Sequence, residues 1–205
     1  MAVVVIGGHS RNVGKTSLMA GLIAAMPELD WTAVKITQYG HGICSAHGSD
    51  CDCAVDQHSF AISEERDRSG ESDTSRFLVA GAAQSFWVRT KQGMLGEAMP
   101  DVRRRLAGAH NVIIESNSVL RFLRPDVYLT MLDTQNPDFK TSAQEFLDRA
   151  TAVVMHEDGH AQPAWHSVSL RPVAGKPIFY VNPPQYCTPE IVDFVRERLA
   201  AVRTK

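Results

Sequence analysis

Residues 7–17 read Gly-Gly-His-Ser-Arg-Asn-Val-Gly-Lys-Thr-Ser. They follow an apolar run, Ala2–Ile6, that is typical of a buried strand. They precede a helical pattern that puts Leu18, Leu22 and Ala25 on one face. A strand, a glycine-rich turn, Gly-Lys-Thr and a helix in this order predict a phosphate-binding loop.

Each part of this loop has a chemical task. Backbone N–H groups at the start of a helix converge on phosphate oxygens, and Lys15 adds a positive charge beside the outer phosphates. The hydroxyl of Thr16 is expected to bind Mg²⁺, and Gly14 lets the backbone approach the phosphates. The residues expected to bind the nucleotide in this loop are Gly8, Asn12, Val13, Gly14, Lys15, Thr16 and Ser17.

The spacing within the loop departs from the common pattern. Four residues usually separate the two glycines, but that count back from Gly14 reaches His9. With Gly8 as the first glycine, the loop is one residue longer. The alternative is a chance Gly-Lys-Thr at the start of a helix, which the flanking strand and helix patterns disfavour.

Composition restricts the class of protein. A chain of 205 residues is long enough for one domain with a sizeable core, so we expect a single domain over 1–205. The net charge of −2 argues against binding nucleic acid or a membrane surface. A cytoplasmic location is the expectation, and the four cysteines then point to free thiols or metal ligands.

Apolar runs alternate with helical patterns along the chain, which predicts a three-layer α/β fold with a mostly parallel sheet. Helices are expected over Thr141–Ala150, from Asp73 to about Ala83, and from Pro189, where Val192, Val195, Leu199 and Val202 would be buried. The ligand of such a sheet lies at the carboxyl ends of its strands. The expected strands are Ala2–Ile6, Thr32–Ile36, Ser85–Arg89, Val112–Glu115, Val127–Leu132, Ala152–His156 and Pro177–Val181.

Acidic and basic residues at the strand ends are candidates for the site. Glu115 ends a strand and is expected to hold Mg²⁺ together with Thr16, with Asp133 as the second choice. The alternative is an ordinary surface carboxylate at a strand end, which the acidic partner required by a phosphate-binding loop disfavours. Lys35 lies within an apolar strand, so its amine either reaches a phosphate or acidic substrate or extends to solvent from the strand end.

Three further residues carry weaker signals. Arg76 follows a helix-capping pattern and either points at phosphate or faces solvent. Asn182 follows the last strand, where it either binds the nucleotide base or only makes an Asn-Pro turn. Cys187 lies apart from the other cysteines and is interpreted as structural.

A polar segment at about 39–72 interrupts the alternation of strands and helices. It is interpreted as a Cys/His-rich insertion that is either a metal-binding loop or a polar loop with incidental thiols. Sulfur and nitrogen ligands favour Zn²⁺, although Ni²⁺ or an iron–sulfur cluster would also suit them. The candidate ligands are Cys44, Cys51, Cys53, His41, His47 and His58.

These motifs together resemble the molybdopterin-guanine dinucleotide biosynthesis B family, over roughly the first 120 residues. The resemblance includes the phosphate-binding loop, Lys35, the segment Asp73-Thr-Ser-Arg-Phe-Leu-Val-Ala-Gly-Ala82, and Ile114-Glu-Ser116 in place of Val-Glu-Gly. The longer loop resembles that of dethiobiotin synthetases, whose Glu-Gly-Ala-Gly-Gly run is here Glu115-Ser-Asn-Ser-Val119. The Asn-Lys-x-Asp motif of ordinary GTPases is absent from the sequence.

The resemblance implies a P-loop protein that binds GTP or ATP with Mg²⁺, a slow NTPase that assists the assembly of a cofactor or metal centre. Lys15, Thr16 and Glu115 would carry the reaction, with Asp133 and Glu157 as candidate bases by position. A protein partner in cofactor assembly and a homodimer are further expectations. The alternatives are an ATP-dependent small-molecule kinase or ligase, in which Lys35 and Arg76 hold an acidic substrate, and a metal-binding, nucleotide-dependent adaptor.

Overall fold

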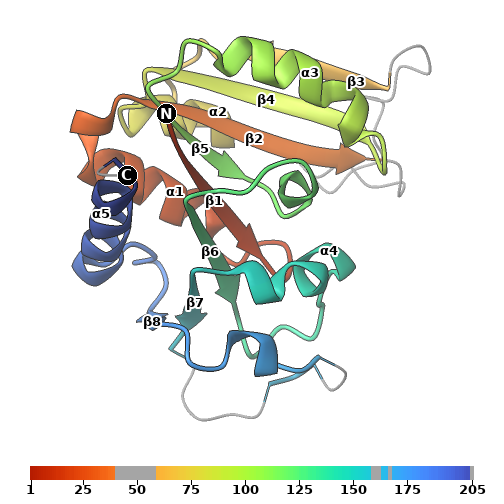
Figure 1. The fold of residues 1–205 in the computed structure, drawn as a ribbon, viewed down its shortest axis with the longest axis vertical. Helices are drawn as coiled ribbons and strands as arrows, with labels where there is room; N and C mark the ends of the chain where they lie inside the picture. The colour runs from red at the N-terminus through yellow and green to blue at the C-terminus, as the bar shows by residue number, and fades with distance from the viewer. Residues whose placement is uncertain (40–58, 158–162, 166–167, 204–205) are drawn as a thin grey trace.

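The computed structural model describes residues 1–39, 59–157, 163–165 and 168–203. Its centre is one eight-stranded sheet with the order β3-β4-β2-β5-β1-β6-β7-β8 (Figure 1). All neighbours pair in parallel except β3 and β4, which confirms the predicted mostly parallel α/β sheet. The strands are β1 Ala2–Gly8, β2 Trp31–Tyr39, β3 Phe60–Glu64, β4 Gln84–Lys91, β5 Asn111–Glu115, β6 Val127–Leu132, β7 Ala152–His156 and β8 Ile178–Val181.

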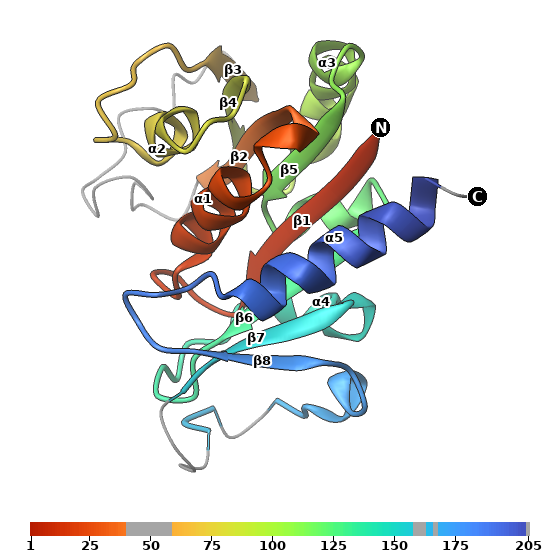
Figure 2. The ribbon, with the colours of Figure 1, turned by 90° about the vertical axis from the view of Figure 1, so that its left-hand side faces the viewer.

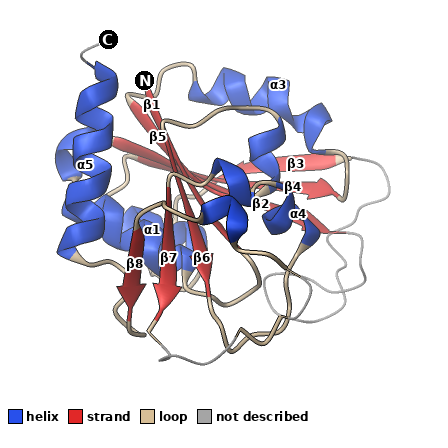
Figure 3. Ribbon diagram, turned by 60° about the horizontal axis from the view of Figure 1, so that its bottom comes forward, coloured by secondary structure: helices blue, strands red, loops and turns tan. Residues whose placement is uncertain are grey.

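Helices cover both faces of this sheet. Helices α1 (Lys15–Ala25), α2 (Asp73–Val79) and α5 (Pro189–Arg203) lie on one face (Figure 2). Helices α3 (Leu95–Leu106) and α4 (Thr141–Glu145) lie on the other (Figure 3). The described helices thus form the two outer layers of the predicted three-layer arrangement.

Strand β1 contributes to both hydrophobic cores. Val4 and Ile6 pack toward α1 and α5, whereas Val5 packs toward α3. All three side chains are fully buried. This two-sided burial explains why β1 is a continuous apolar run rather than an alternating one.

The position of β1 determines where a ligand can bind. Strands β5, β2, β4 and β3 lie on one side of β1, and β6, β7 and β8 lie on the other. The chain after β1 therefore leaves the sheet at the point where the strand order reverses. In open α/β sheets the crevice at this point, at the carboxyl ends of the strands, is the usual ligand site.

Three details of the predicted helices are wrong. The helix expected over Thr141–Ala150 ends at Glu145, because Phe146 leaves the helical conformation, and a 3₁₀ turn, Leu147–Arg149, follows. Helix α2 ends at Val79 rather than near Ala83, since Gly81 has a left-handed backbone (φ +106°) that closes a Schellman-type C-cap. Val202, expected in the core, is exposed near the end of α5, and Ala25, expected on one helical face with Leu18 and Leu22, is exposed at the end of α1.

Strand β3 was not among the predicted strands. It falls inside the polar segment at 39–72, where Phe60 and Ile62 alternate with Ala61 and Ser63. This edge strand pairs antiparallel with β4, and Phe60 and Ile62 pack on the α3 side. Its signal is a two-residue alternation of only two apolar side chains, too short to stand out from a polar stretch.

None of the helices in the described part of the chain has the length and apolar character that a membrane crossing requires.

Candidate nucleotide-binding site

The loop His9–Gly14 joins β1 to α1 through two left-handed residues. Asn12 has a φ of +58° and Gly14 a φ of +89°. Asparagine tolerates this conformation better than most residues, and glycine adopts it freely. A β-carbon on Gly14 would also lie 2.1 Å from the ring of Tyr186, so this position has room only for glycine.

The start of α1 provides an anion-binding environment. Gly14 is the N-cap of α1 and offers no side-chain cap, so the first amides of the helix lack a capping side chain. The Nζ of Lys15 donates a 2.8 Å hydrogen bond to the carbonyl of Ser10 and thus folds back along the loop. Burial lowers the pKa of Lys15, while the Glu115 carboxylate acts in the opposite direction. A phosphate group near these donors would complete their hydrogen bonds and balance the buried charge.

Thr16 and Glu115 meet beside this loop. The hydroxyl of Thr16 donates a 2.8 Å hydrogen bond to Oε2 of Glu115, which ends the neighbouring strand β5. Glu115 is buried, with 7% of its surface exposed. A hydroxyl and a buried carboxylate at this distance form a pair of hard oxygen ligands, the kind that Mg²⁺ prefers.

Lys35 is held between two carboxylates at the same place. Its Nζ lies 3.3 Å from Oε1 of Glu115 and also forms an ion pair with Asp73, the first residue of α2. Burial would lower the pKa of Lys35, but the charges and hydrogen bonds of Glu115 and Asp73 outweigh it and raise that pKa. Arg76, one turn later in α2, donates a 3.0 Å hydrogen bond to the hydroxyl of Ser17. Two cationic side chains therefore tie helix α2 to the site: Lys35 connects it to Glu115, and Arg76 connects it to Ser17.

Asn117 fixes the beginning of the loop. Its side-chain oxygen accepts a hydrogen bond from the N–H of Gly8, and its side-chain nitrogen donates to the carbonyl of Gly8, both at 2.9 Å. A β-carbon on Gly7 would lie 2.3 Å from the Asn117 oxygen. The two glycines thus allow an asparagine from the end of β5 to reach the backbone of β1.

The segment after β6 holds the other side of the loop. His9 accepts a 2.9 Å hydrogen bond at Nε2 from the N–H of Asp133, and its Nδ1 lies 2.7 Å from the carbonyl of Asp138. This pairing requires the neutral ring with its proton on Nδ1, and burial lowers the pKa of His9. The N–H of Lys140 donates 2.8 Å to the carbonyl of His9, and Asn136 donates 2.9 Å to the hydroxyl of Ser10.

Lys140 adds a cation to the loop. Burial, together with the nearby charges of Lys15 and Arg11, lowers the pKa of Lys140 to about 8. Neighbouring cationic side chains repel one another, and a bound anion would relieve that repulsion. The charge distribution therefore agrees with the phosphate site that the loop geometry defines.

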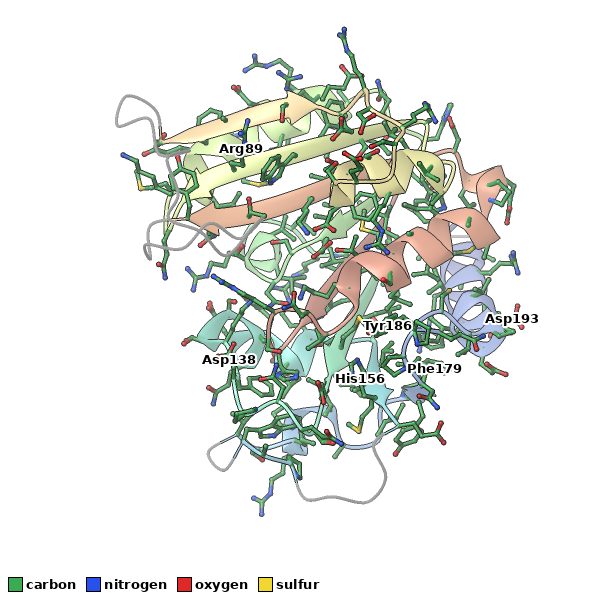
Figure 4. All side chains as sticks on the ribbon, turned by 180° about the vertical axis from the view of Figure 1, so that it is seen from behind. Arg89, Asp138, His156, Phe179, Tyr186 and Asp193 are labelled. Atoms are coloured by element: carbon green, nitrogen blue, oxygen red, sulfur yellow. The ribbon has the colours of Figure 1, made fainter. Side chains whose placement is uncertain are left out.

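The ends of β7 and β8 approach the loop from the other side. Nε2 of His156 lies 3.1 Å from the carbonyl oxygen of Val13, and Nδ1 of the same ring lies 3.7 Å from Oδ2 of Asp133. Tyr186 packs beside His156, with 5.7 Å between the ring centroids, and both are labelled in Figure 4. Asn182, the residue predicted to bind the nucleotide base, is exposed and forms an isolated β-bridge with Gln185.

The other predicted residues are more scattered. Asp133 lies beside His9 and His156, whereas Glu157 is exposed just after β7. Cys187 packs against Gly21 of α1, and burial raises the pKa of its thiol to about 11, which agrees with a structural thiol.

Within the described residues, no group of three or more His, Cys, Asp or Glu side chains is placed to hold a metal ion. The six predicted ligands of the Cys/His-rich segment lie outside the described residues: His41, Cys44, His47, Cys51, Cys53 and His58.

Sequence reasoning missed three residues of this site: Asp73, Asn117 and Lys140. Asp73 stood in the helix-capping motif and was assigned no site role. Asn117 lies two residues after Glu115 and was noted only as a departure from a family motif. Lys140 precedes α4 with no motif around it, and only the fold brings it to His9.

The chain has the α/β fold and the phosphate-binding loop of P-loop NTPases. No family model matches the sequence, and a search of curated proteins finds no match. Among solved structures, the chain is similar to HypB from Helicobacter pylori in complex with nickel (13% identity, TM-score 0.49, covering 98% of this chain and 86% of HypB). It is also similar to LpxK from Aquifex aeolicus in complex with ATP (16% identity, TM-score 0.49, covering 88% and 53%) and to MobB from Bacillus subtilis (14% identity, TM-score 0.44, covering 97% and 98%).

The chain spans about half the length of LpxK. The resemblance to dethiobiotin synthetase stays a prediction from the loop spacing. Similarities at these identities and TM-scores do not indicate the activity of this protein. The fold is assigned from the strand order of the sheet and from the loop at the start of α1.

Proposed function

We propose that this protein binds a nucleoside triphosphate, GTP or ATP, together with Mg²⁺ and hydrolyses it slowly in the assembly of a cofactor or metal centre. The observation that carries the proposal is the 2.8 Å contact between Thr16, on the first turn of α1, and Glu115, at the end of β5. These residues are 99 positions apart in the sequence, and the fold brings their oxygens together beside Lys15.

The residues present suit a Mg²⁺ ion. Thr16 and Glu115 would hold it, and Asp73 offers a further carboxylate on the other side of Lys35. When bound, Mg²⁺ supplies charge neutralisation at the phosphate oxygens. Lys35 then keeps the Glu115 carboxylate oriented, because its amine already contacts both oxygens of that group at 3.3 and 3.4 Å.

The remaining residues of the site would stabilise charge on the phosphates. The amides at the start of α1 and the amine of Lys15 would contact the outer phosphates. Lys140 would add a second amine from the opposite side of the loop. Asp133 and Glu157 stay candidates for orienting water by their positions in the sequence. Asp133 is the nearer of the two to the loop, since its N–H contacts His9.

The test is a titration of the purified protein with ATP and with GTP, each with Mg²⁺ and with EDTA. We expect saturable binding that tightens with Mg²⁺, and a loss of at least tenfold in affinity for Lys15→Ala. Arg104→Ala, which removes an exposed cation of α3, serves as the control and leaves binding unchanged. If neither nucleotide binds, or if Lys15→Ala binds as tightly as the wild type, the proposal is wrong.

A second function, an ATP-dependent small-molecule kinase or ligase, is favoured by the position of Lys35 and Arg76. Lys35 contacts Glu115, the proposed Mg²⁺ ligand, and Arg76 contacts Ser17 at the end of the loop sequence. An acidic substrate bound by these two cations would lie near the terminal phosphate. This reading predicts that nucleotide turnover needs a small acidic co-substrate. Turnover by the protein alone that is insensitive to Lys35→Ala would favour the slow NTPase instead.

We propose separately that the Cys/His-rich segment at about 39–72 binds a metal ion. Metal analysis of freshly purified protein, compared with a Cys51→Ser/Cys53→Ser variant, tests it. Zn²⁺ or another transition metal bound by the wild type and lost from the variant would support a role in metal-centre assembly. Equal and negligible metal in both proteins would contradict it.

A further inference from the structure

One face of strands β2 and β4 carries polar and aromatic side chains. Lys35 and Thr37 on β2 are paired in register with Trp87 and Arg89 on β4. All four are only partly buried, whereas the apolar residues that alternate with them are buried on the α3 side: Val34, Ile36, Phe86 and Val88. Figure 4 shows Arg89 on the face that carries α1 and α2, away from the part of β4 that α2 covers. We call these four residues the β2–β4 strip.

Arg89 and Trp87 form an ordered pair within the strip. The guanidinium carbon of Arg89 lies 4.6 Å from the centroid of the Trp87 ring. The indole nitrogen of Trp87 donates a 2.9 Å hydrogen bond to the hydroxyl of Thr37, which fixes the ring. The flat guanidinium is therefore held against a ring that cannot turn freely.

Within the described part of the chain, Arg89 lacks the carboxylate partner that such a cation normally has. Its Nε is buried without a hydrogen-bond partner, and no carboxylate of the described ranges is within ion-pair distance of it. Two arginines in 3₁₀ turns differ: Arg149 donates to two backbone carbonyls, and Arg121 pairs with Glu145. A partly buried guanidinium without a partner is unfavourable, and an oxyanion that accepts two parallel hydrogen bonds would relieve the cost.

The strip is adjacent to Thr16 and Glu115, the two residues predicted to bind Mg²⁺. Glu115 is paired in register with Lys35, and Lys35 with Trp87. Because neighbouring strands are about 4.8 Å apart, Trp87 lies about 10 Å from Glu115 along the sheet. A small molecule held at Arg89 could extend past Lys35 to the terminal phosphate of a nucleotide bound at Lys15.

We propose that the β2–β4 strip binds the second substrate, a small molecule whose carboxylate or phosphate group is recognised by Arg89 on its Trp87 support. This proposal rests on the proposed nucleotide function, because it identifies the chemical class of the molecule that meets the nucleotide. Thr37 holds the Trp87 ring in place through its hydrogen bond. Lys35 lies at the end of the strip nearest the phosphates of the proposed nucleotide.

Tryptophan fluorescence provides the test. The protein is saturated with Mg²⁺ and ADP, so that the phosphate-binding loop is filled, and is titrated with glutarate and separately with inorganic phosphate. We expect a saturable change in emission with at least one anion, and the responding anion distinguishes a carboxylate from a phosphate ligand. Trp87→Phe should abolish the change, and Arg89→Gln should weaken binding at least tenfold while nucleotide affinity stays at the wild-type value.

Arg105→Gln is the matched control. Arg105 also lies over an aromatic ring of β4, at 5.9 Å from the Phe86 centroid, but Phe86 faces α3 on the other side of the sheet. Its loss should leave the anion response unchanged. Arg89→Lys, which keeps the charge and loses the planar fork, should retain the fold and bind the anion more weakly than the wild type.

Three results would overturn the proposal: no saturable response to either anion, an unchanged response in Arg89→Gln and Arg89→Lys, or an equal loss in Arg105→Gln. The titration is repeated without nucleotide on Lys15→Ala. An anion response that persists there, with the nucleotide site impaired and empty, would separate the strip from the nucleotide site. Failure of nucleotide binding would then count against the proposed function alone.

Discussion

Asn117, two residues after the end of β5, pairs with both backbone hydrogen-bonding groups of Gly8 and so determines where the phosphate-binding loop leaves β1. The pairing joins positions 109 apart in the sequence. It also places Glu115 beside Thr16, because Asn117 and Glu115 belong to the same short stretch at the end of β5.

Replacing Asn117 with Ala should weaken both the fold and the site. The buried N–H and C=O of Gly8 would lose their partners, which costs about 1–3 kcal/mol of unfolding free energy. Urea unfolding followed by circular dichroism measures this loss, and nucleotide affinity should fall with it. Asn182→Ala, an exposed asparagine after β8, is the control and should change stability by less than about 0.5 kcal/mol. Wild-type stability in Asn117→Ala would contradict the role given to this pair.

Glu115→Gln should remove most of the Mg²⁺ dependence of nucleotide binding. The amide keeps the size of the side chain but loses the charge that contacts Thr16 and Lys35. We expect affinity in Mg²⁺ to fall about tenfold or more, which is about 1.4 kcal/mol, while affinity in EDTA changes little. Calorimetric titrations at matched ionic strength measure both. A Mg²⁺ effect as large as that of the wild type would exclude Glu115 as a metal ligand.

Lys140 should make nucleotide binding depend on pH. Its pKa is lowered to about 8, so the amine loses its charge as pH rises from 7 to 9 and attracts phosphate less. Affinity should therefore fall over this range, and Lys140→Met should bind more weakly at pH 7 with a flatter profile. A profile of the same slope in the variant would contradict the assignment.

The same residue should affect the stability of the nucleotide-free protein in the opposite direction. Between about pH 8 and the ordinary value of 10.5, the unfolded chain holds a proton on Lys140 that the folded chain has released. Unfolding free energy contributed by this group therefore rises with pH across that window. Lys140→Met should remove that part of the rise and stabilise the protein at pH 7 by about 1 kcal/mol, as thermal unfolding at several pH values would measure.

Gly7→Ala should be strongly destabilising, because its β-carbon would lie 2.3 Å from the Asn117 oxygen and 2.8 Å from the ring of Tyr128. We expect a loss of about 1–3 kcal/mol. Gly108→Ala is the matched substitution, since no atom lies within 4 Å of its β-carbon. That variant should be neutral or more stable by up to about 1 kcal/mol. Similar unfolding midpoints for the two variants would show that the close approach at Gly7 does not matter.

The sequence by itself determined the sheet and the phosphate-binding loop. The run Ala2–Ile6, the glycines and Gly-Lys-Thr are contiguous, and local backbone preferences and burial on both faces of a strand act on neighbouring residues. Seven of the eight strands follow the apolar runs for the same reason: β6 and β7 have the predicted bounds, and the ends of the other five shift by one to three residues. Thr16 and Lys15 could be identified because the motif fixes their spacing.

Only the tertiary structure decided which distant residues complete the site. Asp73, Asn117 and Lys140 stand in different segments, and no local pattern relates them to residues 7–17. They meet there because parallel strands bring their carboxyl ends to one edge of the sheet, and because α2 and the segment after β6 pack on either side of the loop. The pairing of Trp87 with Lys35 likewise depends on strand register, which is set by long-range hydrogen bonds rather than by sequence spacing.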